Sequence, residues 1–264
     1  MTNIKNKIVF FASVTVFILC VFSLEASAHF MWLNMKPYTI EGGVPVSLTI
    51  SNDHVFGGPG GEFLPKDSLD RLYGIQPDGK ELKIIPKNEV EYQTEVPLKD
   101  DGTYVFVTRA KGGFFSKTAE GYKIGQTKKD LKNVISCTYS EKQAKAIVTI
   151  GKGGGNVFSK TLGHKLEIVP LENPSNLKEG DFVRLKVIFE GNPLKTYVFA
   201  TFAGFSTDDS TFAYATKSDE NGIAKVKIIK PGLWLVIVKH EVPYPDPAKC
   251  DNFSLSSSLT FEVK

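Results

Sequence analysis

Apolar and polar residues alternate along most of the chain with a period of two. Val44, Val46, Leu48 and Ile50 alternate with proline, serine and threonine, as expected for a strand with one buried face. The same pattern recurs in a series of short segments. These further predicted strands cover residues 103–108, 144–150, 182–189, 196–202, 212–216, 223–229, 233–238 and 258–263.

Turn-forming residues separate these segments. They include Pro77-Asp78-Gly79, Asp100-Asp101-Gly102, Gly191-Asn192-Pro193 and Asn221-Gly222. Short strands between such turns, without a strong amphipathic helix, predict an all-β protein built from β-sandwiches. A short helix is expected only at residues 127–135.

A glycine-rich stretch at residues 151–155 follows one predicted strand and indicates a linker. We therefore expect two β-sandwich domains, an N-terminal one at 29–162 and a C-terminal one at 163–264. The hairpin pattern of the second half, with its Pro231-Gly232-Leu233-Trp234 strand, is similar to transthyretin-like, Ig-like modules of secreted bacterial proteins. Such a likeness concerns shape and predicts no activity.

The first 28 residues have the pattern of a signal peptide. Lys5 and Lys7 precede a nearly continuous apolar run at residues 8–24, and Ala26-Ser27-Ala28 fits a cleavage site. The prediction is a periplasmic or secreted protein with no membrane attachment after cleavage. A transmembrane anchor is the alternative, because the run approaches the length of a membrane span.

Charge and motifs exclude several functions. The 264 residues include 32 basic and 29 acidic ones, a formal net charge of +3, which is too balanced to predict nucleic acid as a partner. The sequence has no nucleophile elbow, phosphate-binding loop, dinucleotide fingerprint or zinc-protease motif. We therefore predict no catalytic residues and no enzymatic activity.

Two cysteines, Cys137 and Cys250, remain after signal cleavage. In an oxidising compartment an even pair is compatible with a disulfide. Such a bond would close a long loop and constrain the unfolded chain by about 4–5 kcal/mol. Two separate buried thiols are the alternative, and both interpretations stay open at this point.

Cleavage after Ala28 makes His29 the first residue of the mature protein. A terminal histidine offers its α-amine and its Nδ1, which together chelate one metal, and a second imidazole completes a histidine brace. Nitrogen ligands of this kind suit Cu, Ni, Co and Zn. The alternative is a histidine that follows the cleavage site by chance.

His54 is the best second ligand. It lies in a glycine-rich loop directly after the strand at 44–50, where irregular backbone can approach a ligand. If residues 29–35 form the preceding strand, a hairpin would bring His29 close to His54. Asp53 and Glu62 are possible carboxylate ligands or supporting groups.

The remaining candidates have simpler explanations. Met31 and Met35 share a strand face with His29, and a thioether would favour Cu(I), but core packing explains them better. His164 is expected to be structural, at the domain junction. His240 ends a predicted strand and is a weaker ligand candidate.

Several short segments occur in the same order as in a known protein family. They are 28–33 at the cleavage site, the loop of His54 with Gly57-Gly58, and the segments 163–171, 191–194, 231–235 and 259–263. In these the chain resembles the DUF4198 family, secreted proteins described as periplasmic components of cobalt/nickel uptake. The resemblance implies a two-part β-rich protein that binds or delivers a transition metal. It also implies that His29 and His54 match family histidines.

One segment departs from the family pattern. Some members carry a further histidine in the segment corresponding to 122–128, which has none here, so the third protein ligand is undefined. The favoured function is a metal-binding accessory protein for nickel or cobalt, with a membrane metal transporter as partner. A copper histidine-brace protein, either carrier or oxidative enzyme, and a metal-free structural or adhesion module are the alternatives.

Overall fold

The computed structural model describes residues 29–40, 43–58 and 61–264. The predicted signal peptide, 1–28, lies outside these residues. The described chain is all-β, as predicted, and contains no α-helix. Its helical turns are four 3₁₀ turns: η1 Lys66–Ser68, η2 Lys128–Asp130, η3 Val157–Ser159 and η4 Pro174–Asn176. None of the described helices has the length and apolar character needed to span a membrane.

Three long strands, β11 Val134–Ile150, β18 Gly232–Pro243 and β19 Asn252–Val263, occur among many short ones. The first eleven are β1 Phe30–Lys36, β2 Thr39–Ile40, β3 Ser47–Asp53, β4 Glu62–Phe63, β5 Leu69–Ile75, β6 Glu81–Pro86, β7 Glu91–Thr94, β8 Gly102–Ala110, β9 Gly113–Thr118, β10 Gly121–Ile124 and β11 Val134–Ile150. The others are β12 Leu166–Pro170, β13 Phe182–Phe189, β14 Asn192–Pro193, β15 Tyr197–Phe202, β16 Tyr214–Lys217, β17 Ile223–Lys227, β18 Gly232–Pro243 and β19 Asn252–Val263.

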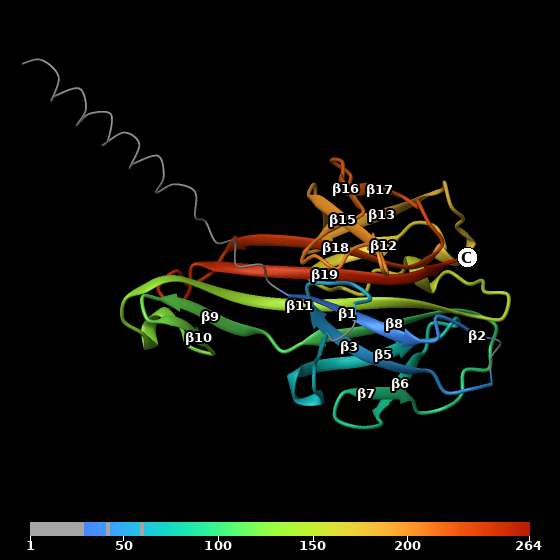
Figure 1. The fold of residues 1–264 in the computed structure, drawn as a ribbon, viewed down its shortest axis with the longest axis horizontal. Helices are drawn as coiled ribbons and strands as arrows, with labels where there is room; N and C mark the ends of the chain where they lie inside the picture. The colour runs from blue at the N-terminus through green and yellow to red at the C-terminus, as the bar shows by residue number, and fades with distance from the viewer. Residues whose placement is uncertain (1–28, 41–42, 59–60) are drawn as a thin grey trace, which may run out of the picture.

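These strands form two sheets (Figure 1). The larger runs in the order β1-β3-β7-β6-β5-β8-β11-β19-β18-β15-β16, and the smaller contains β12, β13, β14 and β17. Strand β11 pairs with β8 in antiparallel fashion and with β19 in parallel. The large sheet therefore continues from the first half of the chain into the second through the β11–β19 pair.

Strand β11 also separates the two main hydrophobic clusters. Ala144, Ala146 and Val148 pack into a cluster with β1, β3 and β8. Ile147, whose side chain points the other way, belongs to the cluster that includes β12, β13 and β18. Because successive side chains of a strand point to opposite faces, one strand serves both clusters.

The helix predicted at 127–135 is wrong beyond a single turn. Only Lys128–Asp130 is helical, as a 3₁₀ turn, and β11 begins at Val134. The Thr127 side chain accepts from Lys129 N, and Asp130 accepts from Thr127 N, so the cap closes one turn. The chain is extended again at Leu131 and then pairs with β9.

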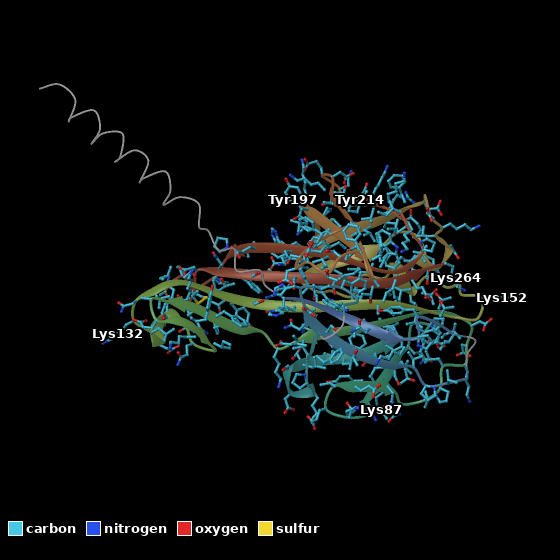
Figure 2. The ribbon with its side chains drawn as sticks, in the orientation of Figure 1. Lys87, Lys132, Lys152, Tyr197, Tyr214 and Lys264 are labelled. Carbon is cyan, nitrogen blue, oxygen red and sulfur yellow. A yellow bond between two sulfur atoms is a disulfide. The ribbon has the colours of Figure 1, made fainter. Side chains whose placement is uncertain are left out.

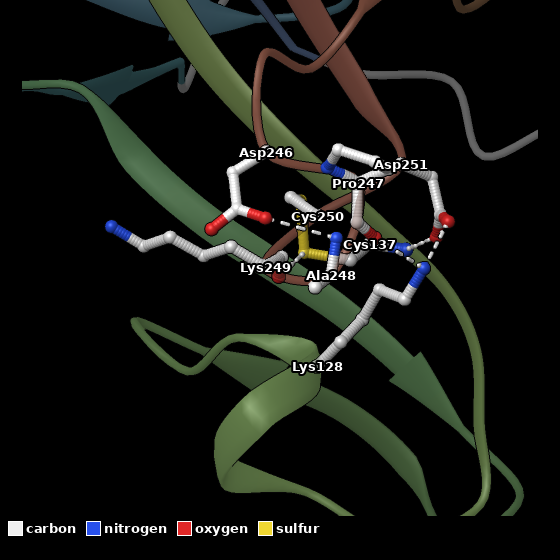
Figure 3. Close-up of polar contacts among 8 residues, drawn as sticks. All are labelled: Lys128, Cys137, Asp246, Pro247, Ala248, Lys249, Cys250 and Asp251. Carbon is white, nitrogen blue, oxygen red and sulfur yellow. Dashed lines mark hydrogen bonds and ion pairs between the residues drawn. A yellow bond between two sulfur atoms is a disulfide. The ribbon is translucent and has the colours of Figure 1, made fainter.

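The structure confirms the disulfide between Cys137 and Cys250, whose Cα atoms lie 4.9 Å apart. It joins β11 to the loop between β18 and β19 (Figure 3). Beside it, Asp251 accepts from the Cys137 backbone N–H at 2.8 Å and from Lys128 Nζ at 2.5 Å. The two segments are therefore joined by covalent, hydrogen-bond and ionic contacts.

Candidate metal centre

The first two candidate ligands lie together at one end of a β-hairpin. Strands β1 and β3 are antiparallel, and Phe30 is registered with Asp53, so the next residues outward are His29 and His54. Their ring centroids are 4.1 Å apart, with planes inclined at 33°. The hairpin prediction is thus confirmed for the proximity of the two rings. Their role as ligands stays a prediction.

Burial on both faces fixes the position of β1. Met31 and Met35 lie in the core cluster of the first half of the chain, at 2% and 5% exposure. Phe30 and Trp32 pack on the other side, in a cluster with Leu235 and Ile237 of β18. The methionines are therefore accounted for by packing, as expected.

The loop that carries His54 is held on both sides. Its own neighbour Asp53 accepts from His54 N at 2.5 Å, and Ser210 N donates to His54 O at 3.1 Å. Gly57 adopts a φ of 72°, and a Cβ there would lie 2.8 Å from the Cβ of Ala203. Glycine is required at this position because the backbone is left-handed and the neighbouring segment approaches it closely.

Aromatic contacts join β1 and the His54 loop to each other and to the second half of the chain. Phe30 meets Phe212 edge-on at 5.5 Å between centroids, and Trp32 meets Phe56 at 5.5 Å. Lys239 Nζ lies 4.1 Å from the Phe30 ring centroid. The histidine pair therefore lies where the β1–β3 hairpin contacts β18 and the loop after β15.

A half-buried lysine, Lys142, supports the site and was not predicted. Lys142 Nζ donates to the backbone oxygen of His29 at 2.9 Å and to Asn52 Oδ1 at 2.8 Å. Burial, with a smaller contribution from Lys239, lowers the pKa of Lys142 to about 8. Lys142 lies more than 80 residues away from both partners in sequence, so no local pattern indicates this contact.

The electrostatic surroundings favour a neutral imidazole at His29. Burial is the main cause that lowers the pKa of His29, and His54 and Lys142 add to it. The carboxylates of Asp53 and Glu62 act in the opposite direction, which places both within electrostatic reach. A neutral ring has the free lone pair that a metal requires.

In the described residues, no carboxylate joins His29 and His54 in a three-residue metal site. Within the described ranges, no group of three His, Cys, Asp or Glu side chains is arranged to hold a metal. The segment 122–128, where some family members carry a histidine, starts on the β9–β10 hairpin, which projects away from β1 in Figure 1. A third ligand must come from elsewhere.

The other two histidines lie apart from this pair. His240, on β18, packs its ring against Phe189 at 4.6 Å between centroids. His164 lies in the loop before β12, and its Nδ1 is buried without a hydrogen-bond partner among the described residues. Burial and the positive charge of Lys145 lower the pKa of His164 to about 4.

The His164 pKa predicts a loss of stability in acid. The charges that act on the ring are Lys145, Arg109 and Arg71, which lower its pKa, and Glu167, which raises it. Below pH 6.5 the unfolded chain binds a proton at His164, whereas the folded chain does not until about pH 4. Stability therefore falls as the pH drops between these values, by up to about 2–3 kcal/mol.

Urea unfolding at pH 7 and pH 4.5 checks this, with His164→Gln as the comparison. The wild type should lose more stability between the two pH values than the variant does. Equal losses would contradict the prediction.

Comparison with known proteins assigns the chain to a family whose function is unknown. The model of a domain of unknown function, DUF4198, matches residues 26–242. No curated protein matches the sequence. Among solved structures, the D0-D1 domain of intimin is 12% identical, with 88% of this chain and 97% of that chain covered and a TM-score of 0.21. Trypsin-activated alpha-2-macroglobulin from Escherichia coli is 12% identical, with 89% and 16% covered and a TM-score of 0.21.

The family match includes both His29 and His54 and spans most of the sequence. It confirms the resemblance seen in the sequence motifs. The protein therefore belongs to the DUF4198 family.

Proposed function

We propose that this protein is a periplasmic accessory protein that binds a transition metal and supports nickel or cobalt uptake. The observation that carries the proposal is the contact between His29 and His54, with ring centroids 4.1 Å apart. Cleavage after Ala28 would add the α-amine of His29, giving three nitrogen donors. The proposed partner is a membrane metal transporter, and the metal is cargo, not a catalytic cofactor.

The donor set fits a late first-row divalent metal. Imidazole nitrogens bind such metals at about 2.0–2.1 Å, so rings at adjacent coordination positions have centroids about 4–5 Å apart. The observed separation of 4.1 Å is in this range. Nitrogen ligands suit nickel, cobalt, copper and zinc, and affinity is usually greatest for copper.

Copper is the second candidate for that reason. A copper histidine brace would use the same three nitrogens, and the same protein would then be a copper carrier or an oxidative enzyme. Because copper binds most such sites tightest, stronger copper binding alone does not separate these functions. Titration with each metal by itself does so: nickel or cobalt bound below about 10 μM supports uptake, whereas binding of copper alone supports the copper functions.

The domain arrangement completes the proposal. We infer two β-sandwich domains, at 29–162 and 163–264, with the second one transthyretin-like. One hydrophobic cluster draws all its buried residues from the first half of the chain, which supports an N-terminal domain. The other combines the second half with residues of β5, β8 and β11, so its packing joins the two domains. The His29–His54 pair would then lie beside the contact between the domains, since the His54 loop contacts Ser210.

The proposal predicts that His54→Ala weakens metal binding at least 100-fold. The loss leaves the His29 chelate with one imidazole, and about 2.7 kcal/mol corresponds to this factor. Calorimetric titration of the mature protein with Ni²⁺, Co²⁺, Cu²⁺ and Zn²⁺ measures it.

His240→Ala is the matched control, because it also removes one imidazole but lies against Phe189. It should bind metal like the wild type. Equal affinities in wild type and His54→Ala, or no metal bound below about 10 μM by the wild type, would contradict the proposal.

A further inference from the structure

A polar cleft lies on the opposite face of β11 from the histidine pair. Lys142 points toward His29, whereas its neighbours Glu141 and Gln143 line a cleft of about 510 Å³. Successive side chains of a strand point to opposite faces, so β11 separates the two features. The volume is within the range of small-molecule sites.

The cleft wall contains a histidine with an incomplete set of hydrogen bonds. His164 lines the cleft, and its Nδ1 is buried without a partner among the described residues. Buried N–H groups without an acceptor are rarer in folded proteins than buried acceptors without a donor. The proton of the neutral ring therefore belongs on Nε2, which makes the ring a hydrogen-bond donor.

Further donors line the same cleft. Gln143 is only 8% exposed and lines the cleft, and its side-chain amide carries two N–H donors. Arg109 lies beside it in the lining, with Nε 2.6 Å from Asp70. A planar guanidinium offers more donors than one carboxylate uses.

The charges of the lining are positive on balance. Arg109, Lys111 and Lys165 face two carboxylates, Asp70 and Glu141. Arg109 pairs with Asp70, and Lys165 approaches Glu141 at 3.7 Å, which leaves Lys111 as the excess charge. Around His164 itself, Lys145 and Arg71 are opposed by Glu167, the ion-pair partner of Lys145, so the excess positive charge of the cleft comes from Lys111.

We propose that this cleft binds a small ligand through an oxyanion, a carboxylate or phosphate group, that is hydrogen-bonded by His164, Gln143 and Arg109. The Nε2–H of neutral His164, the amide of Gln143 and the guanidinium of Arg109 are all hydrogen-bond donors. The net positive lining attracts an anion. Lys111 and Lys165, at more exposed positions, steer the anion to the cleft. The site is independent of the His29–His54 pair and needs no metal.

Calorimetric titration of the metal-free protein with citrate and, separately, with inorganic phosphate tests the proposal. The two probes distinguish a carboxylate from a phosphate ligand. At least one should bind with a Kd below about 1 mM. Gln143→Leu and His164→Leu should each weaken that binding at least 10-fold.

Lys87→Gln is the matched control, because Lys87 is an exposed lysine in the part of the molecule that contains β6 and β7 (Figure 2). It should leave binding unchanged. If Lys87→Gln weakens binding as much as the cleft variants do, the anion binds by general surface charge and the proposal is wrong.

Two other results would also overturn it. One is no binding of either probe below about 1 mM, and the other is unchanged affinity in both cleft variants. Because His164→Leu alters a half-buried ring, thermal unfolding is recorded for each variant. Gln143→Leu keeps the test valid if His164→Leu does not fold.

Discussion

Replacing Cys137 and Cys250 together with alanine is expected to cost about 4–5 kcal/mol of folding stability. The bond joins residues separated by 113 positions, so its loss releases a long loop in the unfolded chain. Both cysteines are fully buried, and alanine adds no polar group in their place. Few single features of a domain contribute as much.

Urea unfolding of the double variant and of the wild type measures this cost. Wild type treated with a reducing agent is the matched control, since it loses the bond but keeps both side chains. Both should unfold at clearly lower urea concentration than the oxidised protein. A shared midpoint for all three would show that the bond contributes nothing to stability.

Glu167→Ala is expected to cost about 3–5 kcal/mol. Lys145 and Glu167 form an ion pair, with 4% and 0% of their side chains exposed. Glu167 also accepts from the backbone N–H of Leu162 at 2.7 Å and of Gly163 at 3.1 Å. Its removal leaves a buried ammonium, and two N–H groups of the loop before β12, without their acceptor.

The double variant Lys145→Met/Glu167→Leu separates the ion pair from the backbone contacts. Apolar replacement of both partners removes the uncompensated charge, so this variant should be more stable than Glu167→Ala. It stays below wild type because two charge-assisted hydrogen bonds from the loop to Glu167 are lost. Unfolding in urea compares the three proteins, and a double variant no more stable than Glu167→Ala would contradict this explanation.

Period-two alternation predicted the strands with one polar and one apolar face. Strands β13 and β17, whose burial alternates, lie close to their predicted positions, and so does β8, which is buried on both faces. Strand β11 is much longer than predicted. Residues 134–143 are mostly polar and show no alternation, but they are extended because they pair with β9 and β19. Backbone hydrogen bonds to other strands do not require alternating apolar side chains, so the sequence does not reveal them.

The proximity of His29 and His54 was predictable because a hairpin is a local structure. The two residues lie at matching ends of neighbouring strands, and the register follows from the alternation. The contacts of Lys142 and Ser210 with this pair were not predictable. Each comes from a segment far away in sequence, and only the folded sheet brings it to the site.

The cleft at His164 was missed for the same reason. The sequence placed His164 at a junction and indicated a structural role. Its surroundings come from β5, β8 and β11, which contribute Asp70, Arg109 and Gln143. These residues form one cleft only when the three strands lie side by side in the folded sheet.

We propose that the α-amine of His29 binds the metal together with the two imidazoles. Calorimetric titration compares the mature protein with a variant that carries one extra alanine before His29. A variant with one extra alanine after Lys264 is the control. The N-terminal extension should weaken binding of the favoured metal at least 100-fold, and the C-terminal one should have no effect. Unchanged affinity in the N-terminally extended protein would show that the α-amine is not a ligand.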